Sequence, residues 1–203
     1  MDEIEAKQLL VKVDHLDRVV GVVEKKEAHL KGILHRAFSI FIFRKVGSST
    51  QLLLQKRASM KYHSGGLWTN TCCGHAEPDL PVEQVVEARL QNEMGFSCPL
   101  ESIGSFYYRA VLDKGMVEHE IDHVFAAFCN PSKIVINPLE VEGFEWIDLE
   151  DLQQILSVQQ QGFTIWFPGA FHLALNYVKR QEARTGAQEA EPPRNSSVLL
   201  GHR

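Results

Sequence analysis

Residues 81–95 read PVEQVVEARLQNEMG and predict one long helix in a chain that otherwise reads mainly as strands. Pro81 suits the first helical position, because its ring fixes φ and an N–H there would have no partner within the helix. Gly95 follows Met94 at a point where helices commonly end. The segments on both sides are rich in β-branched and aromatic residues, which favour strands. A helix among many strands predicts an α+β fold, a mixed β-sheet sandwich with flanking helices.

Strands are expected throughout the rest of the chain, and the first two flank a short turn at residues 15–17 to form a hairpin. The expected strands cover residues 8–13, 18–23, 36–43, 51–55, 68–73, 103–108, 117–128 and 141–147. Further helices are expected over 148–156 and from about 168 to 180. After residue 180 the composition shifts to Ala, Glu, Pro and Ser, so we expect a folded domain over 1–180 and a disordered tail over 181–203.

The overall composition is that of a globular protein, with 44% hydrophobic and 23% charged residues among 203. A net charge of −5 makes a nucleic acid an unfavourable partner. The longest near-apolar stretch, residues 37–43, is too short to cross a bilayer, so no membrane partner is expected. The 4 cysteines form neither a disulfide framework nor a zinc pattern, and we expect a reducing cytoplasm.

Two charged residues fall on the apolar stripe of the predicted helix. Val82, Val85 and Val86 define this stripe at about 100° per residue. Arg89 and Glu93 lie on the same stripe and are i, i+4 neighbours. One interpretation is a buried ion pair, or a stripe that ends early. The other is a site at the end of the helix, where Glu93 binds a cation and Arg89 binds an anion.

The segment VEHEIDHV at residues 117–124 places charges side by side on a predicted strand. Because side chains alternate along a strand, one face carries Glu118, Glu120 and Asp122, and the other carries His119, Ile121 and His123. Like charges on one face repel unless solvent, protons or a metal separate them. The acidic face is therefore either a solvated outer surface or part of a metal site. The histidines of the opposite face are interpreted as structural.

Two further pairs of residues are candidates for chemistry. Cys73 and His75 point the same way from an extended chain. They are either a buried inert thiol and its neighbour, or a nucleophile or proton carrier beside a ligand. His29 and His35 bracket Gly32 and converge if the loop between them folds back. The alternative is a pair of surface histidines.

Taken together, these segments resemble the type 1 isopentenyl-diphosphate isomerases, a Nudix-fold family that interconverts isopentenyl and dimethylallyl diphosphate. The resemblance is carried by HRAFS at 35–39, TNTCCGH at 69–75, YRA at 108–110, VEHE at 117–120 and WF at 166–167. These motifs occur in consistent order within residues 8–180. Their combination is therefore far more specific than any one of them.

The resemblance implies a role for each residue at a matching position. Cys73 and Glu120 match the two catalytic groups, Tyr108 matches a tyrosine beside the glutamate, and Trp166 matches an indole that lines the hydrocarbon pocket. The implied ligands of a divalent metal are His29, His35, His75, Glu118 and Glu120, and the mixed set leaves manganese and zinc open. The implied diphosphate site consists of Lys25, Arg57, Lys61 and Arg89, with Glu93 holding a bridging magnesium ion.

The implied reaction adds a proton to one carbon of a small branched alkene and removes a proton from another. An alkene is a feeble base, so the acid must be strong and the carbocation-like intermediate must be protected from water. We expect Glu120, supported by Tyr108, to donate the proton and the Cys73 thiolate to remove the other. A metal at Glu120 would strengthen this acid. The two groups can exchange roles in the reverse direction.

A Nudix-type pyrophosphohydrolase is the alternative function. Positions where a hydrolytic Nudix box carries Glu, Arg, Glu and Glu are occupied by Leu80, Ala88, Arg89 and Asn92. Glu93, with Gly74 and Gly95, is what remains of that box. Because hydrolysis needs several of these carboxylates to activate water, the sequence favours the isomerase. A catalytically silent binding module would tolerate the loss of Cys73 or Glu120, yet both are present.

Overall fold

Strand β3 (His35–Val46) runs through the middle of the sheet in the computed structural model, which describes residues 7–189. Within these residues, 9 strands form one mixed sheet. The other strands are β1 (Leu9–Val13), β2 (Val19–Glu24), β4 (Ser49–Arg57), β5 (Trp68–Thr69), β6 (Cys72–His75), β7 (Glu101–Val111), β8 (Val117–Phe128) and β9 (Val141–Asp148). The helices are α2 (Lys25–Lys31), α3 (Val82–Met94), α4 (Leu149–Val158) and α5 (Phe167–Glu189), with a short 3-10 turn at Asp113–Gly115.

Both edges of β3 are paired with other strands. Strand β8 runs parallel to it, from His35 opposite Glu120 to Phe43 opposite Phe128. On the other edge, β6 pairs with the first half of β3 and β4 with the second half, both antiparallel. Strand β7 extends the sheet beyond β8, and β5 and β9 pair with β4. A strand that is paired on both edges and covered on both faces needs a nearly continuous apolar sequence, which the middle of β3 supplies.

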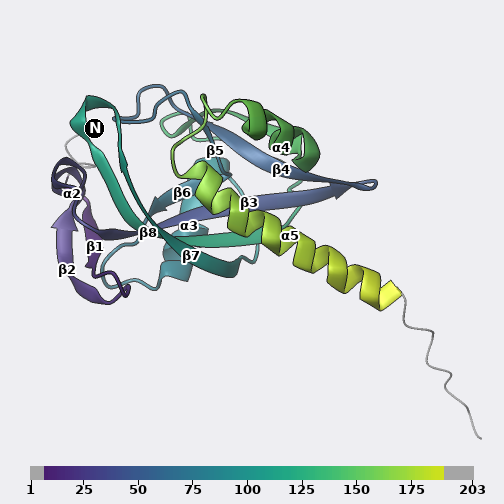
Figure 1. The fold of residues 1–203 in the computed structure, drawn as a ribbon, viewed down its shortest axis with the longest axis horizontal. Helices are drawn as coiled ribbons and strands as arrows, with labels where there is room; N and C mark the ends of the chain where they lie inside the picture. Colours follow the sequence, from purple (N-terminus) through teal and green to yellow (C-terminus); the bar gives the residue numbers. More distant parts are fainter. Residues whose placement is uncertain (1–6, 190–203) are drawn as a thin grey trace, which may run out of the picture.

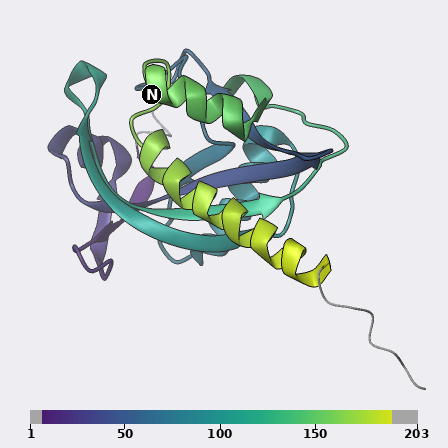
Figure 2. The same cartoon turned by 45° about the vertical axis from the view of Figure 1, so that its right-hand side comes forward.

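Helices cover both faces of this sheet (Figure 1). Side chains of β3 point alternately to the two faces. Phe41 and Phe43 pack in one core with α4 and α5, whereas Ile40 and Ile42 pack in a second core with α3. Figure 2 shows α5 lying across the strands on its side of the sheet. This arrangement confirms the α+β class and the helix-flanked mixed sheet expected from the sequence.

The expected strands are largely present, but one of them is divided and one expected loop is a helix. Strands β1 and β2 form the predicted antiparallel hairpin, and the Asp14 carboxylate closes its turn by accepting the N–H groups of Leu16 and Arg18. The strand expected over 68–73 is instead divided into β5 and β6. Helix α2 occupies a segment that the sequence indicated to be a loop.

Helix α5 is longer than expected. The sequence predicted that it would end near residue 180 and that a disordered tail would cover 181–203. Residues 181–189 are instead helical, and Glu182 pairs with Lys45 of β3 at 2.6 Å. The rest of the expected tail, 190–203, lies outside the described residues. Across residues 7–189, no helix combines the length and the apolarity needed to cross a membrane.

Candidate active site

One face of β8 changes from apolar to acidic along the strand. Val124 and Ala126 pack in the core beneath α5. Glu118, Glu120 and Asp122 continue the same face, because every second residue of a strand points the same way. Each of the three carboxylates is at most 5% exposed. The acidic face is therefore buried, and its interpretation as a solvated outer surface is wrong.

Strand pairing brings the predicted residues into adjacent rows on this face. Neighbouring strands lie roughly 5 Å apart, so residues in one row are in contact range. Across the strands, the rows run Tyr108–Glu120–His35, then Asp122–Ala37–His75, then Val124–Ser39–Cys73.

The short segment between β5 and β6 sets the position of Cys73. The Thr71 hydroxyl donates to the Leu53 carbonyl at 2.6 Å and accepts the Ile42 N–H at 2.9 Å. The side-chain amide of Asn70 also donates to backbone carbonyls. β5 pairs with β4 and β6 pairs with β3, and these buried bonds replace strand pairing in the segment between β5 and β6. They hold β6 against β3, with Cys73 on the same face as the acidic row.

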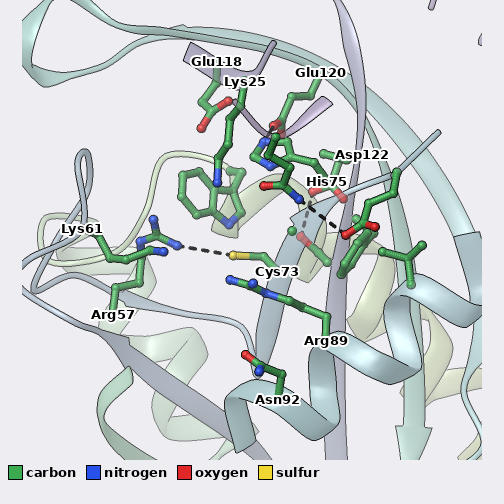
Figure 3. A pocket seen from close by; sticks show the side chains of 18 of the residues that line it. Lys25, Arg57, Lys61, Cys73, His75, Arg89, Asn92, Glu118, Glu120 and Asp122 are labelled. Atoms are coloured by element: carbon green, nitrogen blue, oxygen red, sulfur yellow. Dashed lines mark hydrogen bonds and ion pairs between the residues drawn. The ribbon is translucent and has the colours of Figure 1, made fainter. Parts of the chain in front are cut away.

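A cavity of about 520 Å³ opens over these rows. The predicted residues that line it are Lys25, Arg57, Lys61, Cys73, His75, Arg89, Tyr108, Glu118, Glu120 and Trp166. The remaining three, His29, His35 and Glu93, are at most 3% exposed and contact residues of the lining. Figure 3 shows Glu118, Glu120 and Asp122 on one side together with Lys25, then Arg57, Lys61 and Arg89 on the other, with the Cys73 thiol between them.

Helix α2 brings His29 to the site. Ala28 is fully buried and packs in a small core with the β1–β2 hairpin, which fixes the helix. Gly32 ends the helix with a φ of 61°, a conformation that favours glycine. The chain then turns directly into β3, and the rings of His29 and His35 meet with their centroids 5.1 Å apart. The two histidines therefore converge, although through a helix rather than a folded loop.

The five predicted metal ligands form one cluster, in which one donor atom of each lies within 4.8 Å of the others. We call this set the His–Glu cluster: His29, His35, His75, Glu118 and Glu120. Nδ1 of His29 and Nδ1 of His35 each donate to a backbone carbonyl, at 2.6 and 2.8 Å. A neutral imidazole with its hydrogen on Nδ1 presents a bare lone pair at Nε2. Both rings are therefore oriented as metal ligands usually are.

Acceptor atoms face one another inside the cluster. His29 Nε2 lies 3.1 Å from Glu118 Oε2, and His35 Nε2 lies 3.2 Å from Glu120 Oε1. Among the described residues, His35 Nε2 and Glu118 Oε2 are buried without a hydrogen-bond partner. Facing lone pairs repel unless a proton or a cation lies between them. This mixed set of imidazoles and carboxylates fits a divalent metal ion.

Protonation compensates part of the charge in the cluster. Burial lowers the pKa of His35, but the hydrogen bond and charge of Glu120 outweigh burial and raise it. Burial raises the pKa of Glu120, but the hydrogen bond and charge of His35 outweigh burial and lower it. A proton between His35 Nε2 and Glu120 is thus favoured when no metal is bound, and binding of a metal at Nε2 would release this proton. At His75, burial dominates and holds the pKa well below its usual value, so this ring is neutral.

Three basic side chains lie on the opposite side of the cavity, and carboxylates hold two of them, Lys61 and Arg89. We call Arg57, Lys61 and Arg89 the basic side. Arg89 donates to Glu93 at 2.5 Å and to Glu140 at 2.7 Å, and the same Glu140 oxygen lies 2.7 Å from Lys61 Nζ. The second Glu93 oxygen accepts a side-chain amide bond at 2.9 Å. Arg89 and Glu93 therefore form the ion pair of the first interpretation, and Arg89 lies at the cavity where the second interpretation would place a site.

The two predicted proton-transfer groups differ in protonation. Burial raises the pKa of Cys73 to about 12, although Arg57, which donates to the sulfur at 3.6 Å, opposes this effect. The thiol therefore keeps its proton at neutral pH. Tyr108 donates to the ionised Glu120 at 2.5 Å, and burial raises the pKa of Tyr108 well above its usual value. The proton thus resides on Cys73, whereas the sequence led us to expect a Cys73 thiolate.

Asp122 and His63 also line the cavity, although the sequence did not assign either of them to the site. Asp122 accepts the Ser39 hydroxyl at 2.8 Å, and burial raises its pKa well above the usual range. Asp122 could have been included from the sequence, because it follows Glu120 by two residues on a strand and therefore shares its face. His63 lies 3.2 Å from Glu118, and burial lowers its pKa to about 2. It belongs to the loop between β4 and β5, where no periodicity indicates which way a side chain points.

Known proteins match both the fold and the sequence. A NUDIX domain model matches residues 33–167. The isopentenyl-diphosphate Delta-isomerase 2 of Photorhabdus laumondii is 46% identical over 167 residues, which cover 82% of this chain and 89% of that one. The isopentenyl-diphosphate Delta-isomerase of Pectobacterium atrosepticum is 44% identical over 80% of this chain and 88% of its own. This chain belongs to the isopentenyl-diphosphate Delta-isomerase family.

Solved structures place this isopentenyl-diphosphate Delta-isomerase family member in the NUDIX fold. DR0079 from Deinococcus radiodurans matches with a TM-score of 0.63 and 15% identity, over 82% of this chain and 98% of that one. The NUDIX domain of Shewanella oneidensis NrtR, in complex with ADP ribose, matches with a TM-score of 0.55 and 17% identity, over 71% and 87%. At these identities the likeness establishes the fold alone, and it confirms the NUDIX architecture expected from the sequence.

Proposed function

We propose that this protein is an isomerase that interconverts isopentenyl diphosphate and dimethylallyl diphosphate. The observation that carries the proposal is that Cys73 and Glu120 line one cavity, between a cluster suited to a cation and side chains suited to an anion. Family membership supports the same substrate class. The chemistry is protonation of the double bond and removal of a proton from a neighbouring carbon.

The diphosphate would bind at the basic side of the cavity. Arg57, Lys61 and Arg89 line this side, and Lys25, at the start of α2, also lines the cavity. Guanidinium groups suit phosphate oxygens because they donate two parallel hydrogen bonds. Since Glu140 holds both Lys61 and Arg89, the incoming anion must share these donors with Glu140 or displace it.

Glu120 and Cys73 would exchange one proton each with the substrate. In one direction Glu120 donates and Cys73 accepts, and in the reverse direction Cys73 donates and Glu120 accepts. The state with a Cys73 thiol and an ionised Glu120 is the starting point of the second direction. Tyr108 donates to Glu120 and Arg57 donates to the Cys73 sulfur, so each group has a donor at the atom that becomes charged.

Trp166 would stabilise the positive charge of the intermediate. It is 5% exposed, lines the cavity and directly precedes α5. The face of an indole attracts cations, by about 2 kcal/mol or more where water is excluded. The guanidinium of Arg57 already lies 5.4 Å from the centre of this ring. Burial of the ring also helps to keep water from the carbocation.

The proposed cofactors are two divalent metal ions. The His–Glu cluster would hold manganese or zinc, which draws charge from the Glu120 carboxyl and strengthens it as an acid. Glu93 would hold the magnesium ion that accompanies the diphosphate, since magnesium favours carboxylates and substrate phosphates. Both Glu93 oxygens accept one bond, from Gln55 and Arg89, and each keeps a further lone pair for the ion.

The proposed compartment is the cytoplasm. All four cysteines, Cys72, Cys73, Cys98 and Cys129, are free thiols. The mechanism requires Cys73 as a thiol, and a reducing environment keeps it in that form.

The test is isotope exchange. The full-length protein is incubated with isopentenyl diphosphate, magnesium and manganese in deuterated water, and the product is followed by NMR. We expect dimethylallyl diphosphate that carries deuterium, because the donated proton comes from a group that exchanges with solvent. Recovery of unlabelled substrate from folded, metal-loaded protein would overturn the proposal.

A phosphate assay on the same samples separates isomerisation from hydrolysis. An isomerase releases no phosphate, and we expect none from isopentenyl diphosphate or from nucleoside diphosphate derivatives. Release from the latter without isomerisation would favour the pyrophosphohydrolase. Binding of the prenyl diphosphate without either reaction would indicate a binding module.

A further inference from the structure

His63 lies against the His–Glu cluster without belonging to it. Its side chain is buried, with 3% of the residue exposed, and it lines the cavity. Its Nε2 is 3.2 Å from Glu118 Oε1, and its ring centroid is 5.5 Å from that of His29. A buried imidazole beside a metal ligand is either a packing residue, a further ligand or a group that orients the ligand.

The two oxygens of Glu118 face different partners. Oε2 faces His29 Nε2 at 3.1 Å inside the cluster, whereas Oε1 faces His63 from outside it. The set of donor atoms within 4.8 Å of one another includes Glu118 and His29 but not His63. This geometry favours Oε2 as the metal-binding oxygen and leaves Oε1 for a hydrogen bond from His63. His63 is thus placed as a partner of a ligand rather than as a ligand.

The hydrogen-bond partners also fix which His63 nitrogen carries the hydrogen. A carboxylate oxygen accepts, so Nε2 must donate to Glu118. Nδ1 lies 3.2 Å from the Ser64 hydroxyl, which can donate to it. A neutral ring with hydrogen on Nε2 satisfies both contacts. This is the reverse of the tautomer of His29, whose Nδ1 donates and whose Nε2 carries no hydrogen.

The backbone at His63 is held in place by the basic side. Arg57 donates to the carbonyl of His63 at 3.4 Å and to that of Ser64 at 3.2 Å. On the other side, the Tyr62 hydroxyl lies 3.4 Å from His29 Nε2. Residues 62–64 therefore contact both the cluster and Arg57. The imidazole of His63 is fixed in direction, as a group that orients a ligand must be.

We propose that His63 is a positioning residue for the metal site, whose Nε2–H holds Glu118 so that Oε2 faces the cation. The inference rests on the metal site of the proposed function. Outer partners of metal ligands typically change metal affinity about 10- to 100-fold when they are lost. A residue that serves packing alone would change the stability of the protein and leave the affinity unchanged.

The experiment measures Mn²⁺ binding to full-length, chelator-stripped protein without substrate, by the EPR signal of free Mn²⁺. His63→Phe keeps a ring and removes the donor, and we expect its affinity to fall about 10- to 100-fold. His63→Gln keeps an N–H donor and should remain within about threefold of the unsubstituted protein. The control is His123→Phe, which removes a histidine of the opposite β8 face whose partner is Asp17, and its affinity should not change. Melting temperatures of all the stripped proteins are recorded in parallel.

The outcomes separate the alternatives. Unchanged Mn²⁺ affinity in His63→Phe, with or without a lower melting temperature, overturns the inference and leaves the metal site intact. Equal loss of affinity in His63→Phe and His63→Gln, at the level of His29→Ala, means that His63 is itself a ligand and also overturns it. If the unsubstituted protein binds neither Mn²⁺ nor Zn²⁺, the metal site fails and the inference fails with it. Loss in His63→Phe that His63→Gln restores supports the positioning role, even if His63→Phe is less stable.

Discussion

The two sides of the cavity carry opposite charges and are compensated in opposite ways. In the His–Glu cluster, acceptor atoms face one another, and Glu118 Oε2 and His35 Nε2 lack a hydrogen-bond partner among the described residues. On the basic side, Arg89 is paired with Glu93, and Glu140 holds both Arg89 and Lys61. The cluster is completed by adding a cation. Two of the three cations of the basic side, Lys61 and Arg89, are thus paired before an anion arrives, so the anion must share these donors with Glu140 or displace it.

This difference bears on the proposed proton transfer, because the two proposed groups lie at different places in the cavity. Glu120 belongs to the cluster, where neighbouring charges change with the cation. Cys73 lies between the two sides, with its sulfur beside Arg57. The charge around Glu120 thus depends on the bound cation, whereas the charge around Cys73 depends on Arg57.

The largest expected effect is the loss of either proton-transfer group. Cys73→Ala and Glu120→Gln should each lower kcat by about 10²- to 10⁴-fold, the usual contribution of general acid–base groups. Both variants should melt close to the unsubstituted protein. The matched control is Cys72→Ala, because Cys72 is fully buried in the α3 core and should leave kcat nearly unchanged. Turnover and thermal unfolding measure these effects. Equal losses of kcat in Cys72→Ala and Cys73→Ala would mean that the role of the thiol has been assigned to the wrong cysteine.

Metal removal should test the His–Glu cluster when magnesium is supplied together with the diphosphate in every assay. Stripping with a chelator should abolish turnover and lower the melting temperature by roughly 5–15 °C. A ligand at about 100 to 1,000 times its Kd contributes about 3–4 kcal/mol, and 1 kcal/mol shifts a domain of this size by about 2–4 °C. Manganese or zinc should restore both properties, as followed by calorimetry and by turnover. His29→Ala serves as the control, since its melting temperature should no longer respond to the chelator. Full activity of the stripped protein would remove the metal from the mechanism.

Regular elements of the fold could be predicted because their sequences carry periodicity or end signals. The strand over 117–128 matches β8 at both ends, and Gly95 ends α3 as expected. Helix α2 was missed because it is short, has no side-chain cap and is held by tertiary packing of Ala28. The tail was assigned too early because composition alone does not reveal the Lys45–Glu182 contact, which joins segments far apart in sequence.

The candidate site divides in the same way. Alternation along β8 indicated that Glu118, Glu120 and Asp122 share a face, and the family resemblance supplied the roles. Residues in loops had no such signal. Glu140 lies between β8 and β9, yet it holds Arg89 of α3. Such a contact depends on how three distant segments pack, which neither spacing nor composition encodes.

The protonation of Cys73 can be tested by alkylation. Because thiolate is the reactive form and burial raises the pKa of Cys73 to about 12, inactivation by iodoacetamide should be slow at pH 7. Its rate should rise about tenfold per pH unit up to at least pH 10, whereas free cysteine, with a pKa of about 8.5, levels off above pH 9. Loss of activity over time measures the rate. Cys73→Ser reports labelling at other cysteines by mass spectrometry. A plateau near pH 8 would place an activated thiolate at Cys73.

The smallest expected effect concerns the exchange on the basic side. Glu140→Gln removes the charge that holds Lys61 and Arg89 but keeps a side chain of the same shape. If the diphosphate competes with Glu140, KM should fall about threefold to tenfold with little change in kcat, because about 1 kcal/mol of ion pairing no longer opposes binding. The effect should shrink as salt is added.

A neighbouring carboxylate provides the control for this last change. Glu142 pairs with Lys56 at 2.7 Å, and Lys56 does not line the cavity, so Glu142→Gln should leave KM unchanged. Initial rates at low and high ionic strength measure both variants. A higher KM in Glu140→Gln would mean that Glu140 orients the two cations for the diphosphate. The basic side would then be built by positioning rather than by exchange, and its contrast with the His–Glu cluster would no longer hold.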